Sequence, residues 1–487
     1  MSDTAKVKTA AKTLGIFTLA MINVAAVLSI RNFPSMAEYG WSSVGWYVLG
    51  AIFFLVPLSL AGAELATGWP KGGGVYAWVR EAFGERWGFL AIWCDWSENL
   101  VWFPTLLAFI ASTFAFAISP ALGSDNTWVF TVMMIAFWGT TILNFFGEKA
   151  TNWFGNVGVI AGTIVPATFI ILLGIAYVVM GKPLQIPFSP AALLPQFNLS
   201  TLPFVATVIL LFAGMEMAGF HALETRNPGR DFPRAILLSA IIIITLTVAG
   251  TLAIALVVPQ QSISLSAGIM QAFQDFLKVF NLSWLIAPIA ILIAVGALVQ
   301  LSTWMLGPAK GLGEVARQGN LPPVFQKHNK YGSPVAVLII QASIGTLFSL
   351  LFLFMPNVSS SYWILSAMTV EVYCIMYLLI FAAVIKLRYS QPDTKRAYMI
   401  PGGKAGVWIL AGAGFIACVY TFIVGFIPPS ASIPVGRHPL LMWLGEIGPY
   451  ALLMLAGTVL LSVPPFIFLL FKKPGWKKLQ SDSGTEE

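Results

Sequence analysis

Residues 212–235 read FAGMEMAGFHALETRNPGRDFPRA, and they interrupt a long apolar run that otherwise predicts a membrane-spanning helix. Gly214, Glu216, Gly219 and His221 fall within eight residues inside this hydrophobic segment. A transmembrane helix satisfies its own backbone hydrogen bonds, because lipid offers no substitute partner. A glycine-rich, charge-bearing break therefore indicates backbone that faces a cavity or a ligand. The alternative is a kinked helix whose small residues serve helix packing.

The composition excludes a soluble globular protein. The chain has 487 residues, of which 58% are hydrophobic and only 10% charged, and its mean hydropathy is +0.83. This balance is typical of an all-α membrane protein that crosses the bilayer many times. The polar start lacks the order of regions found in a signal peptide, so we expect the first apolar segment to be retained. Cys94, Cys374 and Cys418 show no metal-ligand spacing, so we expect no disulfide framework, no zinc site and no cofactor.

The sequence predicts twelve apolar spans, each long enough to cross a bilayer. Their limits are 14–37, 43–66, 86–118, 127–146, 155–180, 203–223, 234–258, 283–312, 334–355, 360–387, 406–428 and 443–471. Of the 27 Lys and Arg residues, only Lys182, Lys278 and Arg437 lie in the connections on one side of these spans. Arg31 lies within the first span, and all the others lie on the opposite side or at the span ends that face it. Basic residues collect on the cytoplasmic side, so we expect both termini to be cytoplasmic and the net charge of +7 to reflect topology rather than nucleic-acid binding.

Four regions follow from these limits. We expect a cytoplasmic tail over 1–13, a core of ten helices over 14–387, helices 11 and 12 within 388–471, and a cytoplasmic tail over 472–487. The first span carries Ser29 and Arg31 near its outer half, so it is interrupted like the sixth. Breaks five spans apart suggest an inverted repeat of spans 1–5 and 6–10 with a binding site between the breaks, although the two halves show no visible sequence similarity.

Polar and aromatic side chains within the spans are the candidate site residues. Glu98 and Asn99 share one helical face with Asp95 in span 3, and charges inside a span usually face the protein interior or water. A buried polar network that only joins helices is the alternative for this face. Span 8 places Gln300 and Trp304 one turn apart, and span 10 places Tyr373 and Tyr377 on one stripe. Such aromatic stripes also occur in ordinary packing.

The loop after span 2 and the turn after span 6 carry the candidate gating residues. Glycines 72–74 end one helix, and a short amphipathic helix is predicted after them at the inner surface. Gly73 in this loop, and Glu224 and Arg230 in the basic turn after span 6, are the predicted gating residues. A basic interfacial loop that only obeys the charge asymmetry is the alternative.

Three runs of residues resemble the amino acid–polyamine–organocation superfamily of transporters. The pattern after the sixth-span break matches as Phe212, Gly214, Glu216, Glu224, Asn227, Pro228, Arg230, Pro233, Arg234 and Ala235. At finer grain the chain resembles the bacterial glutamate/γ-aminobutyrate antiporter family from about Leu14 to about Phe471. The runs GGVYAWV at 73–79 and IPGGK at 400–404 carry this finer resemblance, together with Trp304, Tyr373 and Tyr377.

The resemblance implies a leucine-transporter-like fold of twelve helices with a 5+5 inverted repeat, broken helices 1 and 6, and amino acid exchange by alternating access. It also implies that Trp304, Tyr373 and Tyr377 line the substrate pocket. Two residues depart from the pattern: Gln300 stands where acid-resistance members have a glutamate, and Arg31 stands where they have an aromatic residue. The C-terminal tail is also too short for the pore-blocking plug of those members. Exchange therefore follows from the resemblance, whereas glutamate specificity and acid activation do not.

We expect an inner-membrane antiporter that exchanges an amino acid for a related one or for its decarboxylation product, glutamate and γ-aminobutyrate being one option. The partners are an amino acid substrate, a counter-substrate and membrane lipid, with no nucleic acid; the oligomeric state stays open. Glu98, Glu216 and Asp95 favour the alternative of a cationic amino acid or polyamine exchanger, while Arg31 favours an anion. A channel or a substrate-sensing receptor is the alternative of a different class. No nucleophile–base or metal constellation is visible, so we expect no enzyme.

Arg31 has a structural alternative of its own. A charge within a span costs at least about 2.5–3.5 kcal/mol near the bilayer centre, so it needs a partner or a water path. In a functional role, Arg31 faces the outer side of the pocket and neutralises the carboxylate of Glu98, of Glu216 or of the substrate's side chain. In a structural role, it extends to the outer surface or pairs with Glu38.

Overall fold

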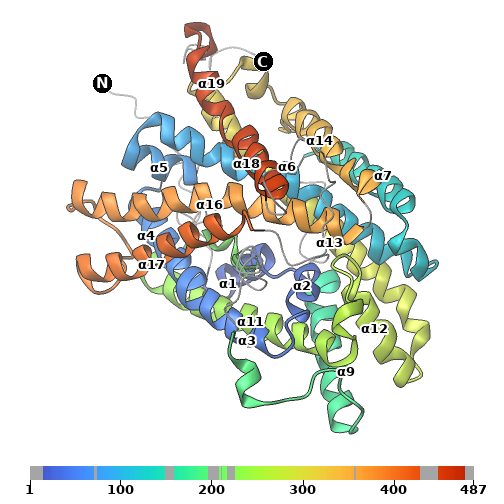
Figure 1. Ribbon diagram of the computed structural model, residues 1–487. Helices are drawn as coiled ribbons and strands as arrows, with labels where there is room; N and C mark the ends of the chain where they lie inside the picture. The colour runs from blue at the N-terminus through green and yellow to red at the C-terminus, as the bar shows by residue number, and fades with distance from the viewer. Residues whose placement is uncertain are drawn as a thin grey trace.

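The computed structural model describes residues 15–70, 74–147, 158, 160–195, 208–209, 211–216, 225–355, 358–427 and 448–477. Within these residues, all the extended regular elements are helical (Figure 1). Ten helices are long and apolar enough to cross a membrane: Ser42–Gly68, Glu85–Ala115, Asn126–Asn144, Ile160–Val179, Gly229–Val257, Ser283–Arg317, Val335–Phe354, Val358–Ser390, Gly403–Val424 and Gly448–Leu470. They match ten of the predicted spans, all except the first and the sixth. The chain is therefore a multi-pass, all-α membrane protein.

Most of these spans correspond to one or two labelled helices. Their bounds are α3 (Ser42–Gly50), η2 (Ala51–Leu55), α4 (Val56–Gly68), α6 (Glu85–Ala115), α7 (Asn126–Asn144), η4 (Ile160–Ile164), α9 (Val165–Val179), α11 (Pro228–Val257), α13 (Ile286–Arg317), α14 (Val335–Ser349), α15 (Leu351–Phe354), α16 (Val358–Ser390), α17 (Gly403–Val424), α18 (Gly448–Ser462) and α19 (Pro464–Leu470). Short connecting turns are η3 (Pro120–Ser124), η5 (Pro190–Leu193), η7 (Gln260–Ser262), η8 (Ser283–Leu285), η9 (Pro323–Gln326) and η11 (Pro474–Trp476).

The first predicted span is broken, as the sequence predicts. Helix α1 (Ile16–Val27) ends where Leu28 and Ser29 adopt extended backbone, and η1 (Ile30–Asn32) and α2 (Phe33–Ala37) follow. Pro34 lies in the first turn of α2, where its missing N–H breaks no helical hydrogen bond. Figure 1 shows α1 and α2 in the middle of the molecule, with α6, α11 and α16 around them.

The described part of the sixth predicted span is also interrupted. Residues 208, 209, 211 and 212 are helical, and Ala213 and Gly214 form a turn. Met215 and Glu216 follow in a short 3-10 turn, whereas residues 217–223, including the predicted Gly219 and His221, lie outside the described residues. The twelve-span count and the inverted repeat therefore stay predictions.

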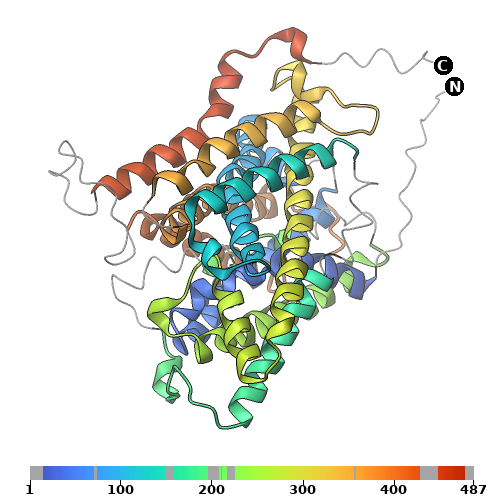
Figure 2. The same ribbon diagram turned by 90° about the vertical axis from the view of Figure 1, so that its right-hand side faces the viewer.

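Helix α6 is the central column of the fold. In the most apolar 18-residue segment of α6, 94% of the residues are buried. The mean hydropathy of that segment is only 1.2, whereas that of the corresponding segment in Gly229–Val257 is 2.6. Helix α6 packs against α5 (Val75–Phe83), α7, α13, α14 and α16. Figure 2 shows it, in light blue, in the interior of the molecule, with helices from other parts of the chain in front of it. Because protein rather than lipid surrounds α6, its polar residues avoid the hydrocarbon.

Two shorter helices lie outside the long spans. Helix α5 (Val75–Phe83) confirms the amphipathic helix predicted after the glycine run, and its apolar face packs on α6 and α16. Helix α12 (Gly268–Val279) has no counterpart among the predicted elements. Its buried side chains, Phe273 and Phe276 among them, pack against α9, α11 and α13.

Candidate functional site

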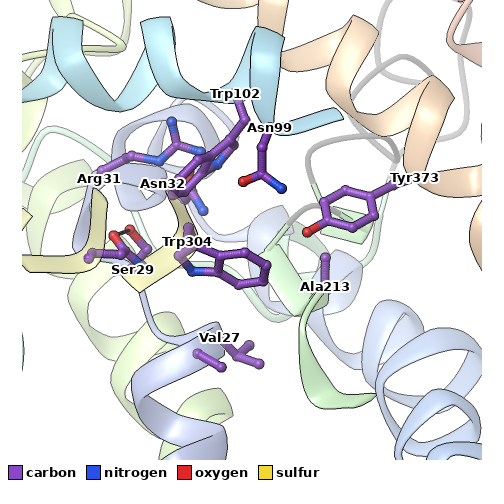
Figure 3. A pocket seen from close by; sticks show the side chains of 11 residues that line it. Val27, Ser29, Arg31, Asn32, Asn99, Trp102, Ala213, Trp304 and Tyr373 are labelled. Atoms are coloured by element: carbon purple, nitrogen blue, oxygen red, sulfur yellow. Dashed lines mark hydrogen bonds between the residues drawn. The ribbon is translucent and has the colours of Figure 1, made fainter. Parts of the chain in front are cut away.

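A cavity lies between the break of the first span and helices α6, α13 and α16. Six predicted site residues line it: Ser29, Arg31, Asn99, Gln300, Trp304 and Tyr373. The other lining residues are Ala26, Val27, Asn32, Trp102 and Ala213. In Figure 3 the Asn99 amide and the Tyr373 hydroxyl point into the same space, with the Trp304 ring beside it. The fold thus brings together side chains from four predicted spans and from the break in a fifth.

The break in the sixth span borders this cavity. Gly214 has φ +105°, a backbone conformation that a side chain disfavours, and its N–H donates to the Tyr377 hydroxyl at 3.2 Å. The same hydroxyl donates to Oε1 of Glu216 at 3.3 Å. The predicted residues Gly214, Glu216 and Tyr377 therefore form one hydrogen-bonded unit, although they do not line the cavity itself.

The break in the first span is tied to α13. The Ser29 hydroxyl donates to Oε1 of Gln300 at 3.3 Å. Trp304, one turn further along α13, packs its ring 5.9 Å from that of Trp102. These contacts join both broken spans to the long helices α6, α13 and α16 around one small space.

Arg31 is buried rather than turned outward. Only 1% of the Arg31 surface is exposed, and its Nη1 donates a hydrogen bond to the Thr105 hydroxyl on α6. The guanidinium carbon lies 5.0 Å from the ring centroid of Trp102 and 5.6 Å from that of Tyr362. Both the extension to the outer surface and the pairing with Glu38 are therefore wrong.

The guanidinium has capacity left for a ligand. Its Nε is buried without a hydrogen-bond partner, and no ion pair joins Arg31 to a carboxylate among the described residues. Because a buried guanidinium without an ion pair is costly, the cavity favours an anionic group next to Arg31.

Three buried carboxylates are neighbours of the lining residues without lining the cavity themselves. Asp95, Glu98 and Glu216 are all buried, and neither oxygen of Glu98 has a hydrogen-bond partner in the part of the chain that the structure describes. Asn99 donates from Nδ2 to the Asp95 carbonyl at 2.8 Å, which fixes its amide along α6. Tyr373 and Tyr377 stack with ring centroids 5.2 Å apart and an interplanar angle of 14°. The carboxylates and tyrosines are therefore a cluster of polar groups within an apolar core.

Of the predicted gating residues, the structure describes Arg230. Gly73 and Glu224 lie outside the described residues. The Arg230 side chain is 59% exposed and forms an ion pair with Asp231 at 2.9 Å, while the Asn227 N–H donates to the same Asp231 carboxylate at 3.2 Å. Arg230 thus lies on the surface at the start of α11, and a gating role for it stays a prediction.

Some residues of the site escaped the sequence prediction. Helical spacing places Trp102 on the same face as Asp95, Glu98 and Asn99, but Trp102 was not among the predicted site residues. Ala213 is adjacent to the predicted Gly214, so its position at the predicted break could have indicated it. Thr105 and Tyr362 contact Arg31 only through the packing of α6 and α16. No local pattern identifies those two.

Comparisons with known proteins place the chain among transporters. A family model described as amino acid permease matches residues 14–448. A transporter of Legionella pneumophila, itself uncharacterized, is 41% identical over 458 residues, which cover 94% of this chain and 96% of that protein. A glutamate/gamma-aminobutyrate antiporter of Lactococcus lactis subsp. lactis is 32% identical over 463 residues, covering 94% and 90%. A probable agmatine/putrescine antiporter of the same organism is 23% identical over 417 residues, covering 84% and 87%.

Proposed function

The chain belongs to the amino acid permease family, and from that premise we propose that it is an inner-membrane antiporter that exchanges amino acids by alternating access. It takes up one amino acid and releases a related one or its decarboxylation product, with glutamate and γ-aminobutyrate as the leading pair. The proposal includes twelve spans with both termini in the cytoplasm. It also includes a 5+5 inverted repeat with the substrate between the breaks of spans 1 and 6.

The position of Arg31 in the cavity is the main support for an acidic amino acid as the substrate. The buried guanidinium lines the cavity, and its Nε has no partner. A guanidinium suits a carboxylate because it can donate two parallel hydrogen bonds in fixed geometry. In our proposal the side-chain carboxylate of an acidic amino acid reaches Arg31. Exchange with a product that has lost one carboxylate would then change the charge at this position.

The backbone breaks hold the part of the substrate that all amino acids share. Helix N-termini attract the α-carboxylate, and carbonyl oxygens of the extended residues attract the ammonium group. Ser29 and Gln300 meet at the first break, and Trp304 and Tyr373 provide aromatic surface next to it. The chemistry is recognition alone, without making or breaking a covalent bond.

A cationic amino acid or polyamine exchanger is the second candidate. Asp95, Glu98 and Glu216 provide three buried carboxylates against the single guanidinium of Arg31, which favours a cation in the same region. The similarity to a probable agmatine/putrescine antiporter points the same way. Arg31 lines the cavity itself, whereas none of these carboxylates does, and this difference favours the acidic substrate.

Counterflow in proteoliposomes tests the proposal. Vesicles loaded with unlabelled glutamate should accumulate labelled glutamate, and vesicles loaded with γ-aminobutyrate should do the same. Screening all amino acids and their decarboxylation products as competitors identifies the substrate class. Competition by arginine, agmatine or putrescine alone would establish the second candidate. Uptake that neither saturates nor needs internal substrate would indicate a channel, and binding without flux would indicate a receptor.

A further inference from the structure

A buried ion pair joins the inner ends of two spans away from the candidate site. Glu64 on α4 is fully buried, and Arg388 at the end of α16 is nearly so. The Arg388 guanidinium donates from Nη2 to Oε2 of Glu64 at 2.6 Å and from Nε to Oε1. The contact is therefore two-pronged, the geometry in which arginine binds a carboxylate most strongly.

The segment between α16 and α17 completes this ion-pair cluster. The Ile400 N–H donates to Oε2 of Glu64 at 2.9 Å, and Nη2 of Arg388 donates to the Ile400 carbonyl at 3.0 Å. Nε of Arg396 lies 3.5 Å from Oε1 of Glu64, and its guanidinium stacks on Trp69, which follows α4, at 4.9 Å from the ring centroid. Burial lowers the pKa of Arg396, while the Glu64 carboxylate opposes that shift. One carboxylate thus holds two guanidinium groups and one backbone amide.

A contribution to the stability of the folded protein does not by itself explain why such charged residues are buried here. Apolar residues of similar volume often stabilise an interior as well as a buried ion pair does, because both charges lose their water. The cluster also lies under a thin cover: Pro392, Asp393, Lys395 and Ala397 of the overlying segment are exposed. When the segment moves away, water can solvate both charged partners, so the contact can open and close again.

Helix α4 connects the ion-pair cluster to the candidate site. A Cβ on Gly62 would lie 3.4 Å from Cα of Glu216, so α4 packs directly on the backbone at the sixth-span break. Glu64 follows only two residues later on the same helix. Figure 1 shows α4, α5 and the α16–α17 connection at one edge of the molecule. A shift of α4 relative to α16 would therefore move the cluster and the break together.

We propose that Glu64 and Arg388 form an ion-pair lock that keeps the inner end of the transport path closed. The lock holds α4 against the α16–α17 segment in the state described here and opens when the site faces the cytoplasm. The inference rests on the alternating access and on the cytoplasmic placement of this end in the proposed function.

A buried reporter on α4 tests the lock without any transport measurement. Ala66 is 1% exposed and lies two residues from Glu64. In the Ala66→Cys protein, reconstituted in vesicles, the alkylation rate by a thiol reagent applied at the cytoplasmic face reports opening. Glu64→Gln and Arg388→Gln should each raise this rate about tenfold, the effect of about 1.4 kcal/mol on an opening equilibrium. The exchanged pair, Glu64→Arg with Arg388→Glu, should bring the rate back towards that of the parent.

The controls separate a lock from a merely structural ion pair. Arg317→Gln removes an exposed ion pair with Glu314 and should leave the rate unchanged. Arg388→Lys keeps the charge without the two-pronged contact and should give an intermediate rate. Unchanged alkylation in Glu64→Gln overturns the lock. So does a loss of thermal stability that the exchanged pair does not restore. Absence of counterflow by the wild type, with the alkylation pattern intact, counts against the proposed exchange and not against the lock.

Discussion

The Tyr377 hydroxyl accepts a hydrogen bond from the Gly214 N–H across 3.2 Å, which ties α16 to the turn that breaks the sixth span. The same oxygen donates to Glu216 two residues further along the chain, at 3.3 Å. One phenol therefore satisfies a backbone donor that a continuous helix would have satisfied internally. The break depends on a side chain from a helix more than 160 residues away in sequence.

Tyr377→Phe tests this dependence. Removing the hydroxyl leaves a buried N–H without its partner, which costs about 1–3 kcal/mol. We expect the variant to insert and fold, to bind substrate at least tenfold more weakly and to lose most counterflow. Tyr420→Phe on the partly exposed face of α17 is the matched control and should behave as the wild type. Wild-type affinity in Tyr377→Phe would show that the hydroxyl does not shape the site.

Gly214→Val tests the backbone conformation at the break. At φ +105° the nearest heavy atoms to an added Cβ lie at 3.6 Å, so the penalty comes from the backbone and not from a clash. Holding a non-glycine residue in such a conformation costs about 1–3 kcal/mol. We expect inserted protein with abolished exchange. Gly139→Val in α7, where an added Cβ meets nothing within 4 Å, should retain exchange.

Trp304→Ala tests the aromatic surface of the cavity. The indole lines the cavity and contacts Trp102, so its loss should weaken substrate binding by about 1–3 kcal/mol. Scintillation-proximity binding or a substrate-induced shift in Tm measures this directly. Trp408→Ala, on the exposed face of α17, should leave affinity unchanged. Equal substrate affinities for the two variants would show that Trp304 serves packing and does not contribute to substrate binding.

Arg31→Ala tests the substrate class. We expect the variant to lose exchange of glutamate and aspartate selectively and to keep neutral substrates, because the partner of the side-chain carboxylate is gone. Arg31→Lys should recover only part of the activity, since an ammonium cannot donate two parallel hydrogen bonds from a fixed plane. The wild-type profile is measured first. A wild type that ignores acidic substrates, or an unaltered profile in Arg31→Ala, contradicts the assignment.

Glu38, beyond the end of α2, should make the thermal stability pH-dependent. Burial raises the pKa of this carboxyl from 4.5 to about 7, so the folded protein keeps its proton over a range where the unfolded chain has lost it. Stability should therefore fall as the pH rises from about 4.5 to about 7. Glu38→Gln should flatten this part of the Tm–pH curve, whereas the exposed Asp393→Asn should not. An unchanged slope in Glu38→Gln would assign the dependence to other groups.

The sequence predicts the long spans well because lipid imposes one rule on all of them. Apolar length alone located ten helices that the structure describes, and Ser29 and Arg31 marked the break of the first span. Side chains one turn apart on one helix, such as Gln300 and Trp304, were also found by spacing. Residues that meet across helices, such as Thr105 and Arg31, carry no local signal, because their contact depends on how α6 packs.

The same limit explains why Glu64 and Arg388 were missed as a pair. Each reads from sequence as a charge near the end of a span, which the positive-inside rule and interfacial placement already explain. Only the fold shows that the two groups, 324 residues apart, share two hydrogen bonds.

The burial of α6 also bears on how the protein is made. Its most apolar window has a mean hydropathy of 1.2, the lowest value among the candidate spans of the described chain. Each charged residue near the middle of such a helix opposes its entry into lipid by about 2.5–3.5 kcal/mol. On its own, α6 would therefore move only slowly from the translocon into the lipid. We expect it to be retained beside the nascent chain until α13 and α16, its main packing partners, have been synthesised, so that its burial sets the order of assembly in the membrane.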